Sequence, residues 1–110
     1  MSTRVYLLEA RSLLSAGLRA TLKELPEITL AGRTDAPERA VPEMARLRVD
    51  VVVADEALGW KTLGALLPEM IRLPGRPRVL VVASMGASDG PRHAAEAGAA
   101  GYLAATSSAE

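Results

Sequence analysis

The chain has 110 residues, with 13 basic and 13 acidic side chains, so its formal net charge is zero. This balance lacks the basic stripe of a nucleic-acid-binding protein, and we expect no DNA binding by the chain itself. It has no cysteine, which excludes disulfides, thiol catalysis and thiolate metal sites. No apolar run approaches the ~18 residues of a membrane span, so we expect a cytoplasmic protein without membrane contact.

Hydrophobic residues make up 49% of the chain, which suits a single domain over residues 1–110 with an aliphatic core. The apolar run 5–8 predicts a first strand, and leucines at helical spacing predict a helix that Pro26 ends. Residues 28–32 predict a second strand. Asp35, followed three residues later by Glu38, indicates a capping box for a second helix that runs to about Leu47.

The second half of the chain continues the alternation. The run 51–54 has no polar alternation and ends at Asp55, which is typical of a central strand covered on both faces. A third helix is expected around 63–71, a strand at 79–83, a helix at 88–97 with Gly98 as its stop, and a strand at 101–104. We expect Pro42 and Pro68 to kink or shorten the second and third helices.

Strands that alternate with helices predict a parallel sheet with helices on both faces. Ligand chemistry in such sheets lies beyond the carboxyl ends of the strands. The positions to inspect there are Glu9, Ala10, Arg11, Asp55, Glu56, Ala57, Ala83, Ser84, Met85 and Ala105.

Four tracts resemble the receiver domains of bacterial response regulators, of the type that precedes LuxR-type DNA-binding domains (NarL/FixJ-like). They are residues 13–20, 48–55, 78–82 and 97–103, in the order and spacing of that family. The resemblance covers almost the whole chain. It implies an α/β, flavodoxin-like, doubly wound sheet of five parallel strands in the order 2-1-3-4-5.

The resemblance also implies a chemistry, because receivers accept a phosphoryl group on an Asp. Negative charge then collects on the phosphoryl oxygens and must be neutralised by Mg²⁺, which an acidic pair and the acceptor Asp hold. A hydroxyl after the fourth strand and a Lys after the fifth complete the family's site.

This chain retains only part of that set. Asp55 stands at the phosphoacceptor position and Glu9 at the first position of the acidic pair, so the two form a vestigial acidic pocket. The second acid, the hydroxyl and the Lys are replaced by alanines, at Ala10, Ala83 and Ala105. We therefore expect no catalytic residue, inefficient phosphorylation of Asp55, weak Mg²⁺ binding at best and no other cofactor.

Several residues have two interpretations. Asp55 is either a signalling residue or a structural acid that caps the next segment or pairs with Arg11 or Lys61. Arg11 is either a cation for the vacant pocket or a solvated loop residue. Tyr102 matches the aromatic switch position, or is an ordinary edge-strand aromatic. His93 is expected to be solvated.

Three functions compete. The leading hypothesis is a regulatory and dimerisation module of a transcription regulator that works independently of phosphorylation. The second is a phosphorelay receiver modified on Asp55 by a histidine kinase. The third is a small enzyme or cofactor-binding domain on a flavodoxin-like sheet. The first two are not enzymes.

The chain ends where a receiver's fifth helix should begin, so we expect a truncated protein whose DNA-binding domain lies elsewhere. The uncovered apolar face near the first and fifth strands predicts a homodimer or a larger assembly.

Overall fold

The computed structural model describes residues 2–11, 13–84 and 89–104. Its strands form one parallel sheet in the order β2-β1-β3-β4-β5, which confirms the predicted topology. The strands are β1 Thr3–Leu8, β2 Ile28–Thr34, β3 Val51–Asp55, β4 Arg78–Ala83 and β5 Gly101–Ala104. The helices are α1 Leu13–Glu24, α2 Pro37–Arg46, the short 3₁₀ helix η1 Glu56–Leu58, α3 Trp60–Ile71 and α4 Gly90–Ala97.

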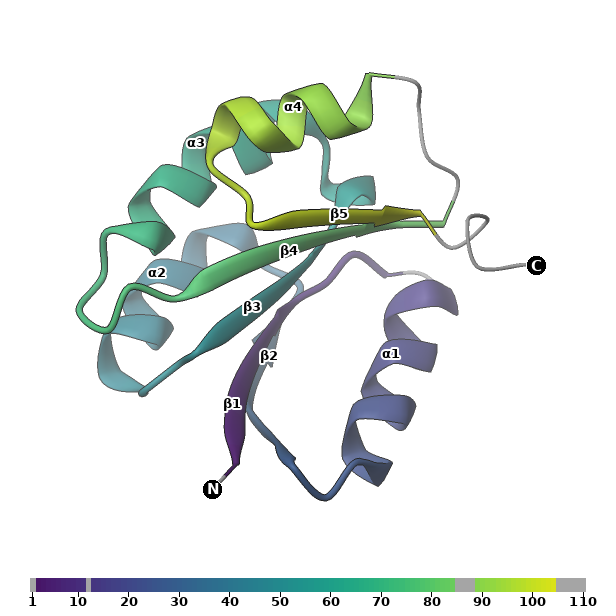
Figure 1. Cartoon of the computed structure of the whole chain (residues 1–110), viewed down its shortest axis with the longest axis vertical. Coiled ribbons are helices and arrows are strands. Elements are labelled where there is room, and N and C mark those ends of the chain that lie inside the picture. The colour runs from purple at the N-terminus through teal and green to yellow at the C-terminus, as the bar shows by residue number, and fades with distance from the viewer. Residues whose placement is uncertain (1, 12, 85–88, 105–110) are drawn as a thin grey trace.

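The helices lie on both faces of the sheet (Figure 1). Within the described residues, α1 covers one face, and α2, α3 and α4 cover the other. The larger core cluster lies under α2 and α3 and includes the buried side chains of Tyr6, Leu63 and Leu67. A smaller cluster under α1 joins three buried valines and Leu7 of the central strands to half-buried leucines of the helix. None of the described helices is long and apolar enough to cross a membrane.

The expected capping box before α2 is wrong. The N-cap position of α2 is Ala36, which makes no side-chain cap, and Pro37 follows it in the first turn. The hydroxyl of Thr34 instead accepts a hydrogen bond from the backbone N–H of Ala36 at 3.1 Å. Asp35 is therefore available for a different partner, Arg11.

The two interior prolines shorten neither helix, because α2 continues through Pro42 and α3 through Pro68. Proline removes one backbone donor and crowds the preceding turn, so the packed faces of these helices must offset that cost. The predicted stop at Gly98 is confirmed: it ends α4 in the left-handed conformation, with φ of 93°.

The register of the central strands positions the site. Leu8 of β1 pairs with Ala54 of β3, so the next residues, Glu9 and Asp55, emerge side by side at the carboxyl edge of the sheet. Glu9 is fixed there because its backbone N–H donates to the carbonyl of Thr34 at 2.9 Å.

Candidate functional site

Asp55 is buried at the end of β3, with 2% of its surface exposed. The Ser15 hydroxyl donates to Oδ2 at 3.0 Å, and the backbone N–H of Ala57 donates to Oδ1 at 2.9 Å. The second bond caps η1, as one of the two sequence interpretations proposed. Asp55 therefore has a structural role, whatever its role in signalling.

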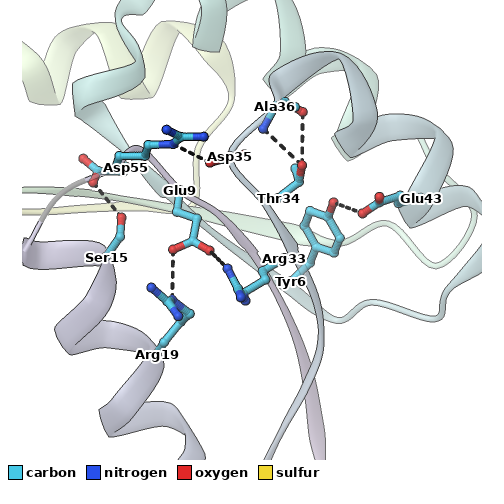
Figure 2. Close-up of polar contacts among 11 residues, drawn as sticks. Tyr6, Glu9, Ser15, Arg19, Arg33, Thr34, Asp35, Ala36, Glu43 and Asp55 are labelled. Carbon is cyan, nitrogen blue, oxygen red and sulfur yellow. Dashed lines mark hydrogen bonds and ion pairs between the residues drawn. The ribbon is translucent and has the colours of Figure 1, made fainter.

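Glu9 is also buried and is held by two arginines, as Figure 2 shows. Arg19 Nε donates to Oε1 at 3.1 Å, and Arg33 Nη1 donates to Oε2 at 2.8 Å. Arg19 comes from α1 and Arg33 from β2, so the carboxylate ties three elements together. Charge-assisted hydrogen bonds of this kind are stronger than neutral ones.

Arg11 lies on Asp35 rather than on Asp55: Nε donates to Oδ2 at 2.9 Å, and the Arg11 side chain is 90% exposed. The pair shifts both groups in the expected directions, because Asp35 raises the pKa of Arg11 and Arg11 lowers the pKa of Asp35. Of the two interpretations of Arg11, the structure matches the exposed loop residue.

The Mg²⁺ that the family resemblance implies does not fit these residues. Both carboxylate oxygens of Glu9 accept hydrogen bonds from guanidinium groups, and Ala10 brings no oxygen in its side chain. Within the described ranges, no three Asp, Glu, His or Cys side chains gather where they could hold a metal ion.

The other altered positions lie around the same edge. Ala83 is buried at the end of β4, and the adjacent Ser84 is exposed. Ala105, at the position of the family's Lys, lies outside the described residues.

Tyr102 belongs to a second polar cluster, on the β5 side of the sheet. Its hydroxyl donates to Oε2 of Glu56 at 2.9 Å, and Nε1 of Trp60 donates to the same oxygen at 2.9 Å. Tyr102 is therefore connected by a hydrogen bond to the segment that follows Asp55. An ordinary edge-strand aromatic would not make this connection.

Gly90, the first residue of α4, makes room for this cluster. A Cβ atom built at this position would overlap the hydroxyl of Tyr102 and lie 2.7 Å from Oε2 of Glu56. The expectation that His93 is solvated is wrong in part, since its ring stacks on Trp60 with centroids 5.4 Å apart. The side chain of His93 is still 35% exposed.

Sequence reasoning missed Ser15, Arg19 and Arg33 as site residues. Ser15 and Arg19 lie one helical turn apart and so project from the same face of α1, toward Asp55 and Glu9 respectively. In the sequence, this polar pair beside the leucine stripe of α1 could have identified both residues as site residues.

Comparison with known proteins shows the fold. No protein-family model matches the chain, and no curated protein matches it. A LuxR-family two-component response regulator from Aurantimonas has a TM-score of 0.76 at 21% identity, over 94% of this chain and 74% of that one. The signal receiver domain of the putative response regulator NarL from Mycobacterium tuberculosis has a TM-score of 0.73 at 22% identity, over 94% and 83%.

The receiver domain of RcsB from Salmonella enterica serovar Typhimurium, solved with the phosphomimetic BeF3-, has a TM-score of 0.79 at 11% identity. It covers 96% of this chain and 79% of that one. The structural neighbours are thus receiver domains of response regulators, and this chain has their fold.

Proposed function

We propose that this chain is a receiver-like regulatory and dimerisation module of a bacterial transcription regulator, and that it works independently of phosphorylation of Asp55. The fold of its neighbours supports a regulatory rather than an enzymatic role. DNA binding would belong to a domain outside this chain. A cytoplasmic location remains a prediction.

The burial and bonding of Asp55 carry this proposal. A carboxylate that attacks phosphorus must present an oxygen in line with the leaving group, and the transferred charge must be neutralised. Asp55 is 2% exposed, and Ser15 and Ala57 each donate to one of its oxygens. Glu9, at the end of the neighbouring strand β1, is paired with two arginines.

Acetyl phosphate with Mg²⁺ tests the proposal. We expect intact-protein mass spectrometry to show no added phosphoryl group, with the same result for the Asp55→Asn variant. Beryllofluoride with Mg²⁺ should leave the amide NMR spectrum unchanged. Rapid uptake that the Asp55→Asn variant abolishes would overturn the proposal.

A second candidate, a phosphorelay receiver modified on Asp55, is favoured by one observation. Asp55 ends β3 beside Glu9, at the carboxyl edge where the family places its acceptor. Rapid uptake in the experiment above would establish this candidate. The third, a cofactor-binding domain, has no supporting observation, and an absorbance scan of the purified protein tests it.

The proposed homodimer is supported by the face that α1 covers only in part. Leu103 of β5 is 50% exposed, and Leu80 of β4 is only partly buried. We expect light scattering to give a dimer mass or larger, and Leu103→Glu to shift the chain toward monomer. Leu25→Glu is the control, because Leu25 is similarly exposed but follows α1. A clean monomer for the unaltered chain would contradict the dimer.

A further inference from the structure

A cavity of about 270 Å³ opens at the carboxyl edge of the sheet, where α1 faces β1 and β2. Charged side chains dominate its lining, which consists of Glu9, Ala10, Arg11, Ser15, Arg19, Arg33 and Asp35. In a receiver this neighbourhood would be expected to attract a cation. Here the lining carries three arginines and two acids, so its net charge is positive and should attract an anion instead.

The three arginines reach the cavity from three different segments of the chain. Arg19 comes from α1, Arg33 from β2, and Arg11 from the loop after β1. Like charges repel at close range, so such a cluster needs anionic groups to hold it. Glu9 and Asp35 supply two such anionic groups.

The guanidinium groups keep most of their donors. Each has five N–H bonds, and in the described part of the chain each uses one nitrogen in a side-chain bond to an acid. Glu9 fixes the orientations of Arg19 and Arg33, and Asp35 fixes that of Arg11. These long side chains are therefore partly ordered before any ligand binds, which reduces the entropy lost on binding.

We propose that this cavity binds a phosphate group, either as free phosphate or on a small molecule. Arginines approaching from three segments of the chain can surround a tetrahedral group from several sides, whereas a planar carboxylate is satisfied by one or two guanidinium forks. Ser15 also lines the cavity. Asp55, which would repel an anion, is not among its lining residues.

The proposal goes beyond the regulatory role and does not rest on it. Reversible binding adds no covalent mass, so it is distinct from phosphorylation of Asp55. The Asp55→Asn variant should still bind phosphate, which separates a failure of this proposal from a failure of the proposed function.

Titration with sodium phosphate, followed by NMR of the arginine Nε–H groups and by thermal denaturation, tests the site. Sodium chloride at matched ionic strength and sodium acetate serve as comparison anions. We expect saturable shifts of Arg11, Arg19 and Arg33 and a raised melting temperature with phosphate alone. Glycerol phosphate is the second probe. Tighter binding than free phosphate would indicate that the group is carried on a small molecule, and equal or weaker binding that the free anion is the ligand.

Two exposed residues allow substitutions of opposite sign without disturbing the core. Arg11→Gln removes a cation and should weaken phosphate binding about tenfold, whereas Asp35→Asn removes an anion and should strengthen it several-fold. Arg72→Gln, at the exposed end of α3, is the matched control and should change nothing. The proposal fails if phosphate causes no saturable change, if chloride or acetate matches it, or if the Arg11 and Asp35 variants bind as the control does.

Discussion

The acids that follow β1 and β3 are both held in place, but by opposite kinds of partner. On the β2 side, Glu9 accepts hydrogen bonds from two arginines. On the β5 side, Glu56 accepts from two neutral groups, the Trp60 indole and the Tyr102 hydroxyl. The first cluster balances charge and leaves spare donors beside a cavity. The second leaves little spare volume, because Gly90 lies directly against it.

The difference indicates how each side of the site can respond. The arginine cluster should respond to added or removed charge, because an anion or a charge substitution changes its electrostatic balance. The aromatic cluster should sense packing, because any added atom displaces a ring. Substitutions on the two sides of the site should therefore separate these two behaviours.

Replacing the buried acid should have the largest effect. Glu9→Gln presents an amide N–H₂ group to guanidiniums that can only donate, so one bond is lost and a buried donor is unsatisfied. We expect a loss of about 2–3 kcal/mol in the free energy of unfolding, measured by urea titration. Glu27→Gln, at an exposed position, is the control. Equal losses for the two variants would show that the cluster does not stabilise the fold.

Adding one methyl group at the start of α4 should have the next largest effect. Gly90→Ala should displace Tyr102 from Glu56 and cost about 1–3 kcal/mol. The fluorescence of Trp60, the only tryptophan, should change as well. Gly64→Ala in α3 meets open space and should instead gain roughly 0.5–1 kcal/mol from helix propensity. Losses of equal size at both glycines would contradict the packing argument.

Glu43 is a third acid held by a hydrogen bond, and its partner, Tyr6, gives a test that uses pH. The Tyr6 hydroxyl donates to Glu43 at 2.6 Å, and burial, with this bond, raises the pKa of Tyr6 above its ordinary value of 10.0. A raised pKa means that the folded protein keeps its proton where the unfolded chain loses it. Stability is therefore fully present below pH 10 and falls as the pH rises beyond it.

Tyr6→Phe should remove that alkaline decline while costing about 1 kcal/mol at neutral pH. Urea titrations at neutral and alkaline pH check both effects. The comparison is between Tyr6→Phe and the unaltered chain, because the two share every other titratable group. If the Tyr6→Phe variant loses as much stability at alkaline pH as the unaltered chain does, the loss comes from another group.

The exposed ion pair should have the smallest effect on stability. Asp35→Asn removes the partner of Arg11, but both side chains are exposed, at 90% for Arg11 and 45% for Asp35, and their attraction is screened. We expect no measurable change in the urea midpoint. A clear destabilisation would show that the loop after β1 depends on this pair for its structure.

The fold could be predicted from the sequence because its signals are local. The unbroken apolar runs of β3 and β4 and the leucine stripe of α1 each identify an element without reference to the rest of the chain. The edge that carries Glu9 and Asp55 follows from parallel strand order alone. The inactivity of Asp55 toward phosphoryl donors stays a prediction.

The partners within the site could not be predicted in the same way. Arg11, Arg19 and Arg33 have long side chains, and the acid that each one meets depends on how α1 and β2 pack against β1. Asp35 shows the conflict directly, because its local pattern with Glu38 indicated a helix cap while tertiary packing gave it Arg11. A local rule fails where a distant charge competes for the same side chain.

The contact between Gly90 and Tyr102 has a consequence for the evolution of such chains. Because a side chain at position 90 would displace a tyrosine at 102, the two positions should not vary independently. In an alignment of relatives, a larger residue at position 90 should occur together with a smaller one at 102, or with an acid missing at 56. Such paired replacement would identify the chains that share this tyrosine-to-loop connection.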